Sequence, residues 1–235
     1  MSAPAYTVHW ADPLPGLDAG WDDPAWTNAQ TAGLTNFRPE SSAHRPRASV
    51  RLLHDGRGLR GVYQVHDQFV RSIRTRYMDE VWKDSCVEVF LQPRPGAGYF
   101  NLEMNAGGAH LCCYIEDPER VPGGFKKFTR LPAAIGELIR VRPSVPGVEA
   151  PRRSARPVVI DPEIAGPVTW ELSFLAPLSV FEHYVGPLGN VRGQQWRGNF
   201  YKCADEGSHP HWGSWVPVDE FNFHLPRCFG AICFQ

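Results

Sequence analysis

The sequence has no long hydrophobic run and no excess of charge of either sign. None of its apolar stretches approaches the roughly 18 residues of a membrane-spanning helix, so no membrane partner is expected. Among its 235 residues, 24 lysines and arginines balance 25 aspartates and glutamates, and the formal net charge is -1. Binding to nucleic acid needs a clustered cationic surface, so this balance argues against a nucleic-acid partner.

Signatures of common enzymes are also missing. The sequence contains no nucleophile elbow of the form G-x-S-x-G and no phosphate-binding G-x-x-x-x-G-K loop. A literal G-x-G-x-x-G spans residues 56–61, but it sits in a turn that leads into a strand, whereas dinucleotide binding needs a helix there. His209 and His211 could ligate a metal from one strand face, although a structural role is the favoured interpretation. No catalytic residue is predicted, and a protein that is not an enzyme is favoured.

The six cysteines are not spaced for pairing or for a common metal site. None lies in a C-x-x-C motif, and Cys112 and Cys113 are adjacent, so on a strand they point to opposite faces. Free and mostly buried thiols are therefore expected. The N-terminal residues lack the basic start and apolar core of a signal peptide, which predicts a cytoplasmic protein as written. Secretion stays open if the chain is a trimmed part of a longer one.

Turn-forming residues, in contrast, are abundant, and short alternating runs separate them. Glycine and proline number 22 each, nearly a fifth of the chain. The pattern predicts an all-β fold in a single domain over residues 1–235: an antiparallel two-sheet β-sandwich, jelly-roll-like, with about ten strands and little helix. The clearest hairpin covers residues 48–67, and residues 178–183 could form one or two helical turns. The expected loops are residues 35–46, 69–76 and 118–132 and an exposed Pro/Arg-rich insertion at 143–157.

Residues 82–114 organise the chain as a three-stranded meander. One face of its first two strands is apolar, from Val87 to Met104, and should pack on the core. The simplest interpretation of the other face is a solvent-exposed surface with no binding function. However, polar side chains held in rows beside the indole of Trp82 suit a ligand that has hydroxyl groups and flat apolar faces, such as a sugar. The polar candidates on that face are Glu88, Asn101, Glu103 and Asn105.

Eight tryptophans are many for a chain of this length, and three of them are candidates for ligand contact. Trp82 precedes a strand and should be partly exposed, while Trp212 and Trp215 lie in the segment HPHWGSWVP between strands. Two indoles at the mouth of a sandwich could grip a sugar ring, or they could plug the end of the core. At least one of Trp212 and Trp215 is expected in the core. Glu88 and Glu103 could also form a carboxylate pair of the glycosidase type, which leaves a hydrolase as an alternative.

Four blocks between residue 81 and the C-terminus, in a fixed order, carry a family resemblance. They are VWKDSCVEVFLQP, YFNLEMNAGG, GNFYKCADEGSHPHWGSWVP and FHLPRCFGAICF. Together they resemble the family 9 carbohydrate-binding modules, and specifically the freestanding bacterial proteins that are family-9-like. The resemblance implies a β-sandwich that binds a mono- or oligosaccharide without catalysis, with two tryptophans around the sugar and a carboxylate and amides on its hydroxyls.

The resemblance also implies roles for single residues. Trp82 matches the first tryptophan, Glu88 matches the carboxylate, and Trp215 matches the second tryptophan, with Trp212 as the fallback. Asn101, Glu103 and Asn105 lie in the matching strand, without an indication of which of them faces the ligand. Bound calcium is structural in some members, so structural calcium is a candidate cofactor, whereas the metal-binding residues are unknown.

This chain departs from the familiar pattern in three respects. It is expected to lack an attached glycosidase domain and a secretion signal, and it carries an insertion at 143–157. A similar sandwich also holds haem in related redox domains, and Met78, Met104 or the histidines could supply axial ligands. A haem-binding or redox-linked domain is therefore the alternative function.

Overall fold

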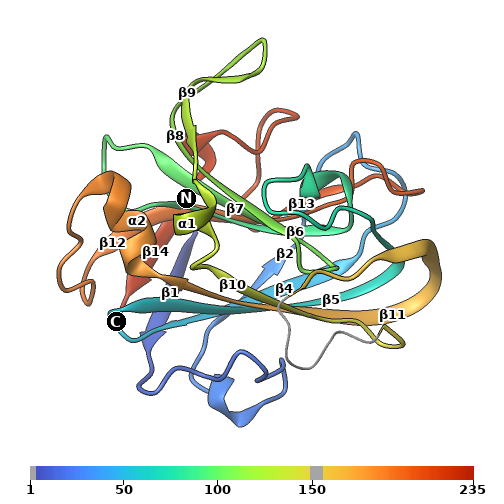
Figure 1. The fold of residues 1–235 in the computed structure, drawn as a ribbon, viewed down its shortest axis with the longest axis horizontal. Helices are drawn as coiled ribbons and strands as arrows, with labels where there is room; N and C mark the ends of the chain where they lie inside the picture. The colour runs from blue at the N-terminus through green and yellow to red at the C-terminus, as the bar shows by residue number, and fades with distance from the viewer. Residues whose placement is uncertain (1–3, 149–155) are drawn as a thin grey trace.

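A computed structural model describes residues 4–148 and 156–235 (Figure 1), and it confirms an all-β sandwich with little helix. The strands are β1 (Ala5–Trp10), β2 (Thr31–Leu34), β3 (Asn36–Phe37), β4 (Arg47–His54), β5 (Gly58–Ser72), β6 (Cys86–Gln92), β7 (Tyr99–Asn105), β8 (His110–Val121), β9 (Gly124–Arg130), β10 (Arg140–Ser144), β11 (Ile160–Pro177), β12 (Gln195–Cys203), β13 (Trp212–Ser214) and β14 (Gly230–Phe234). Fourteen strands are described rather than about ten, because short strands such as β2, β3 and β13 have too few residues to show a recognisable alternation in the sequence. The helices are α1 (Ala133–Gly136), α2 (Leu178–Val185) and the 3-10 turns η1 (Pro24–Trp26), η2 (Val81–Lys83) and η3 (Pro226–Cys228).

The strands form two sheets that face each other. The first has the order β10-β11-β5-β4, with β2 on β4, and the second has the order β14-β12-β6-β7-β8-β9, with β13 on β12 and β3 on β13. Strand β1 joins them, because its first four residues pair with β14 and its last two residues pair with β4. Both of these pairings are parallel, and the other strand pairings among the described residues are antiparallel.

The main core fills the space between the two sheets. It includes Val87, Val89 and Leu91 of β6 and Phe100, Leu102 and Met104 of β7, as the two-residue alternation predicted. Trp170 of β11 and Phe200 of β12 pack into the same core. No helix among the described residues has the length and apolar character needed to cross a membrane.

A second, smaller core lies on the outer face of the second sheet. It joins the outward side chains of β6, β8 and β12 to residues of the C-terminal segment, among them Val218, Leu225 and Phe229. Part of the face that could have been solvated is therefore covered by the chain itself. The uncovered part between this segment and η2 becomes the floor of the pocket described below.

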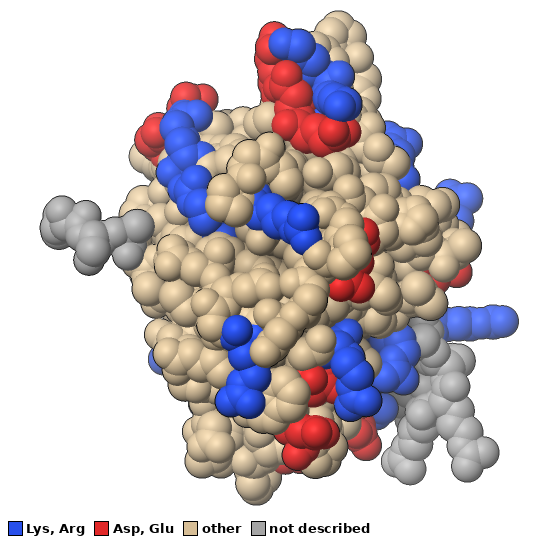
Figure 2. Space-filling model, turned by 90° about the vertical axis from the view of Figure 1, so that its left-hand side faces the viewer, with Lys and Arg blue, Asp and Glu red and all other residues tan. Residues whose placement is uncertain are grey.

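The prediction of a loop at residues 118–132 is wrong. Strands β8 and β9 form a hairpin that projects beyond the body of the sandwich, at the top of Figures 1 and 2. Its turn has Gly123 and Gly124 at positive φ, and ion pairs such as Lys126–Glu119 at 2.7 Å line its exposed part. The hairpin matters because its inner side faces the pocket.

Charges of both signs are interspersed on the face seen in Figure 2 rather than gathered by sign.

Other expectations met mixed outcomes. Strand β5 continues to Ser72, so the loop expected at residues 69–76 begins later, and β3 occupies two residues of the loop expected at 35–46. The hairpin of β4 and β5 and the helical turns of α2 are confirmed. Within 143–157 the structure shows β10 ending at Ser144, and residues 149–155 lie outside the described residues.

Candidate functional site

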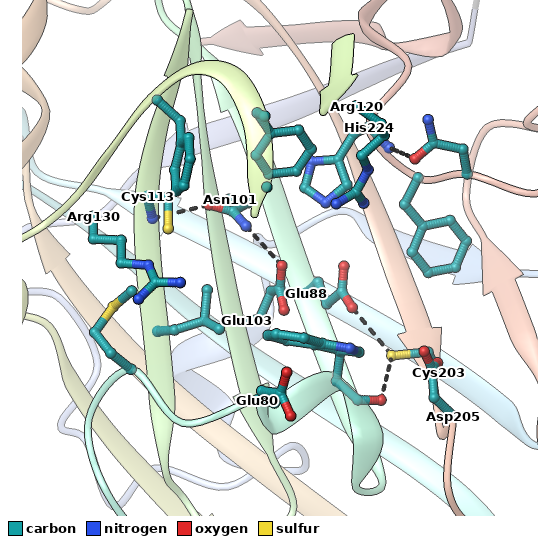
Figure 3. Close-up of a pocket in the computed structure, with 18 of the residues that line it drawn as sticks. Glu80, Glu88, Asn101, Glu103, Cys113, Arg120, Arg130, Cys203, Asp205 and His224 are labelled. Carbon is teal, nitrogen blue, oxygen red and sulfur yellow. Dashed lines mark hydrogen bonds between the residues drawn. The ribbon is translucent and has the colours of Figure 1, made fainter. Parts of the chain in front are cut away.

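A pocket of about 480 Å³ opens on the outer face of the second sheet (Figure 3). Strands β6 and β7 form its floor, and the β8–β9 hairpin closes one side. The segment η2, the loop between β12 and β13, and the chain at residues 221–224 complete its walls. The pocket therefore collects residues from segments that are far apart in the sequence.

Two glutamates form the centre of the floor. Glu88 of β6 and Glu103 of β7 are register partners on adjacent strands, and their side chains are 2 % and 4 % exposed. Asn101 Nδ2 donates to Glu103 Oε1 at 2.7 Å, and Asn101 Oδ1 accepts the Cys113 N–H at 2.9 Å. Among the described residues, Glu103 Oε2 has no hydrogen-bond partner, although it is buried. The floor therefore presents a carboxyl oxygen whose hydrogen bond is still to be made.

Burial changes the charge of this floor. Removal from water raises the pKa of Glu88 well above its usual value, and the neighbouring Cys203 and Glu103 raise it further. Burial also raises the pKa of Glu103 to about 7, against the hydrogen bond from Asn101, which lowers it. Glu88 therefore favours its protonated form more than an ordinary glutamate does, and Glu103 is divided between its two forms near pH 7. The pair can then both donate and accept hydrogen bonds.

Two tryptophans line the pocket, and Asp205 connects them. Trp82 of η2 and Trp212 of β13 are both partly buried. The Trp212 Nε1–H donates to Asp205 Oδ1 at 2.7 Å, and the Asp205 N–H donates to the Trp82 carbonyl at 3.2 Å. Phe221 packs edge-on against Trp212, with ring centroids 4.5 Å apart. These contacts fix the indole of Trp212 and hold the loop that carries it against η2.

The β8–β9 hairpin brings cationic and aromatic groups that the sequence analysis missed. Arg120 stacks over the Phe125 ring, with its guanidinium carbon 4.2 Å from the ring centroid, and Arg130 of β9 also lines the pocket, away from Arg120 (Figure 3). His224, from the C-terminal segment, packs against Phe125 and lies 2.9 Å from the Tyr99 hydroxyl through its Nδ1. The Gly123-Gly124 pair, followed by Phe125 and Phe128, was the sequence signal that could have revealed this hairpin.

A sequence model of carbohydrate-binding family 9 matches residues 25–124 and 158–234, which is most of the chain and includes the pocket residues except Phe125, Phe128 and Arg130 of β9. The chain belongs to carbohydrate-binding family 9. No significant match was found among curated protein sequences.

Solved structures with a similar fold include the following three. A proposed carbohydrate-binding protein from Bacteroides uniformis ATCC 8492 superposes with a TM-score of 0.81, at 25% sequence identity and with all of both chains covered. A family 9 carbohydrate-binding module from Caldicellulosiruptor kristjanssonii in complex with glucose gives a TM-score of 0.63 at 14% identity, covering 99% of this chain and 96% of that one. The complex with cellotriose gives 0.56 at 14% identity, covering 99% and 94%.

Of the seven predicted site residues in this family 9 chain, five line the pocket and two do not. The five are Trp82, Glu88, Asn101, Glu103 and Trp212. Trp215 packs against the main core instead, with its ring centroid 5.3 Å from that of Phe200 and 6.1 Å from that of Tyr6. Of the two candidates for the second tryptophan, the fallback Trp212 lines the pocket and Trp215 does not.

Asn105 shares the face of Asn101 and Glu103 but is fully committed to the protein. Its Nδ2 donates to the Arg74 carbonyl and to Asp84 Oδ2, both at 2.8 Å, and its Oδ1 accepts the Ala109 N–H at 2.8 Å. These bonds fix the turn between β7 and β8 and the approach to η2. Asn105 therefore supports the site without facing the pocket.

The histidine pair and the methionines offer little to a metal or to haem. His211 Nδ1 lies 2.8 Å from the His209 carbonyl and its Nε2 lies 2.7 Å from Lys202 Nζ, so both ring nitrogens are engaged. Met78 lines the pocket, whereas Met104 lies in the main core on the other face of the sheet, so the two cannot share one haem. Neither observation favours the redox alternative.

Calcium has a poor match in this site. It takes six to eight oxygen ligands. In the described part of the chain, the one group of three His, Cys, Asp or Glu side chains whose donor atoms all lie within 4.8 Å of one another is Cys86, Glu88 and Cys203. Two of these donors are sulfur, which calcium does not favour. Structural calcium stays a prediction.

Proposed function

We propose that this protein binds carbohydrate without catalysis, with a sugar ring held in the pocket beside Trp82 and Trp212. The apolar faces of the ring would pack against the indoles, and its hydroxyl groups would bond to the polar floor. The ligand class is a mono- or oligosaccharide. A cavity of about 480 Å³ lies within the roughly 300–1,000 Å³ that is usual for small-molecule sites.

The observation that carries this proposal is the buried, unpartnered Glu103 Oε2 on the pocket floor. A buried polar atom without a hydrogen bond costs about 1–3 kcal/mol, so folded proteins rarely leave one unless a ligand or water completes it. The adjacent Glu88 favours its protonated form, because burial raises its pKa well above the usual value. A sugar hydroxyl, which both donates and accepts, would match this mixed pair.

The ligands of related modules support the same class. The two structures from C. kristjanssonii contain glucose and cellotriose, and their chains cover nearly all of this one. At 14% identity they support the fold and the kind of ligand considered, and the individual contacts are argued from the pocket of this chain.

Hydrolysis fits the glutamate pair less well. A glycosidase places its two carboxyl groups on either side of the scissile bond, about 5–9.5 Å apart. Glu88 and Glu103 are neighbours on one floor, where register partners have Cβ atoms roughly 5 Å apart and point the same way. Both carboxyls lie side by side on adjacent strands and line the same floor, so they do not face each other across a cleft that could hold a scissile bond between them. This arrangement favours binding over catalysis.

The test is calorimetric titration of the purified protein with glucose, xylose, mannose, galactose, cellobiose and cellotriose. We expect at least one of them to bind, and Trp82→Ala to weaken that binding by about tenfold or more, equivalent to about 1.4 kcal/mol. Trp10→Ala is the matched control, since Trp10 is an exposed tryptophan outside the pocket. Absence of binding to every sugar, or equal affinity in Trp82→Ala, would refute the proposal.

A further inference from the structure

Three soft or acidic side chains converge beneath the pocket, and the sugar-binding proposal does not use them as a group. Cys86 and Glu88 are two residues apart on the same face of β6, and Cys203 of β12 is the register partner of Cys86. Strand geometry thus brings all three to one point. Their donor atoms lie within 4.8 Å of one another, and all three residues are buried.

The contacts show that the donors point toward each other. Cys203 Sγ lies 3.1 Å from Glu88 Oε1 and 3.5 Å from the Trp82 carbonyl oxygen, as the dashed lines of Figure 3 show. In a tetrahedral zinc site with bonds of about 2.3 Å, neighbouring sulfur ligands are roughly 3.7 Å apart. All the donor atoms of this cluster lie within 4.8 Å of one another, so small side-chain adjustments would place three donors around one ion.

From this geometry, we propose that Cys86, Glu88 and Cys203 form a binding site for one thiophilic divalent cation of the zinc class. Two thiolates and one carboxylate are a donor set that Zn²⁺ accepts and that Ca²⁺ or Mg²⁺ does not prefer. Glu88 and Cys203 also line the pocket, so the fourth ligand position faces it. The site is therefore open on one side, and a water molecule or a ligand group in the pocket would complete it.

The alternative for the two cysteines is a purely structural role. Free cysteines are among the most buried residue types, and a thiol can fill a core as a small apolar group. Cys112 of β8 illustrates this, because it lies in the main core among apolar side chains. Cys86 and Cys203 differ from it in facing each other and a carboxyl group at the edge of a cavity. Cys112 is for that reason the matched control in the experiment.

The first experiment titrates the reduced, metal-free protein with Co²⁺ and follows the near-ultraviolet absorption of thiolate–cobalt bonds. We expect a band that saturates at one ion per chain and is lost in Cys203→Ser and in Cys86→Ser, while Cys112→Ser retains it. Competition against a chromophoric chelator should show Zn²⁺ affinity falling more than about 100-fold in both serine variants, since even changes outside the ligand shell cost 10–100-fold. Absence of the band in the unmodified protein, or its persistence in both serine variants, would overturn the proposal.

A second measurement needs no variant and is unaffected if a serine substitution prevents folding. X-ray absorption of the Zn²⁺-loaded protein should show two sulfur ligands at about 2.3 Å and lighter atoms at about 2.0–2.2 Å. A shell of nitrogen and oxygen without sulfur would place the ion elsewhere and overturn the proposal. Neither measurement uses a sugar, so the outcome is independent of the proposed function.

Discussion

Glu88 and Glu103 stand directly opposite each other on β6 and β7, both buried and both facing the pocket. Two like charges at this separation in a poorly hydrated site repel each other, so at least one of the pair is protonated near neutral pH. The alternation of two short strands therefore produces a floor that carries both a hydrogen-bond donor and an acceptor.

The raised pKa of Glu103 predicts a pH dependence of stability. Its pKa is about 7 in the folded protein and near its ordinary value of 4.5 when unfolded, so between these values the folded state binds more protons. The free energy of unfolding should therefore fall as the pH rises from about 4.5 through 7. At about 1.4 kcal/mol per pKa unit, this contribution amounts to roughly 3 kcal/mol. Glu103→Gln, which cannot ionise, should be more stable relative to the unmodified protein at pH 8 than at pH 4.5.

Urea unfolding at a series of pH values from 4.5 to 8.5 measures this difference. Glu116→Gln is the control. Glu116 lies on the exposed part of β8, and its substitution removes the same formal charge as Glu103→Gln. A stability difference between Glu103→Gln and the unmodified protein that stayed constant across this range would contradict the assignment.

The two C-terminal tryptophans should respond in opposite ways to truncation. Trp212 lines the pocket, so Trp212→Ala should weaken sugar binding about tenfold or more while leaving most of the stability. Trp215 packs against Phe200 and Tyr6 at the main core, so Trp215→Ala should cost about 3–5 kcal/mol of stability. Trp215→Phe, which keeps an aromatic ring, should fold and bind sugar with unchanged affinity. Loss of binding in Trp215→Phe together with normal binding in Trp212→Ala would reverse our placement.

The sequence alone was sufficient to predict which side chains of β6 and β7 face the core and which face away from it. The two-residue period of β6 and β7 separates Val87 and Leu102 from Glu88 and Glu103, because neighbouring strand residues point to opposite faces. That period cannot show how a polar side chain is used. Asn105 lies on the same face of β7 as Glu103, but its side-chain amide donates hydrogen bonds to the carbonyl of Arg74 and the carboxylate of Asp84 and does not face the pocket.

The positions of Trp212 and Trp215 and the presence of the β8–β9 hairpin could not be predicted without knowledge of the tertiary structure. Trp212 is in β13, whereas Trp215 follows the end of that strand, and its N–H donates to the Phe200 carbonyl on β12. The separation of three residues between Trp212 and Trp215 does not reveal that one side chain faces the pocket and the other packs against the main core. In the β8–β9 hairpin, proline and charged residues resemble a loop, and the register of the two strands shifts between Ile115 and Arg120. Pairing with β9 overrides the weak local preference there.

The glycine at the end of the G-x-G-x-x-G segment should be needed for packing rather than for a turn. Gly56 lies in the turn, at a φ of 77°, but Gly61 is within β5. A Cβ atom on Gly61 would lie 2.1 Å from Phe174 Cε1 and 2.8 Å from Leu52 Cδ2. Gly61→Ala should therefore destabilise the protein by about 1–3 kcal/mol or more, as overpacked cores do. Thermal unfolding checks this, with Gly33→Ala as a strand control whose nearest Cβ neighbour is 3.6 Å away; equal losses would contradict the packing argument.

Lys202 and Asp67 form a buried ion pair between the sheets, and breaking it from one side should be costly. Lys202 Nζ is 3.8 Å from Asp67 Oδ2 and 2.7 Å from His211 Nε2, and both side chains of the pair are fully buried. Burial alone would raise the pKa of Asp67, but the charge of Lys202 and the hydrogen bond from His44 hold it well below its usual value. Lys202→Met leaves that carboxylate without its cation, so we expect a loss of about 3–5 kcal/mol at pH 7.

The pH dependence and a double variant separate this effect from lost packing. A carboxyl whose folded pKa is lowered stabilises the protein above its unfolded pKa, and the contribution disappears as the pH falls through the folded value. Without Lys202 the pKa of Asp67 should rise, so the stability deficit of Lys202→Met should shrink as the pH is lowered from 7 toward 4. Adding Asp67→Asn should recover part of the deficit at pH 7, because it removes the unpaired charge. A deficit that stays the same at both pH values and in the double variant would show that Lys202 acts through its aliphatic packing alone.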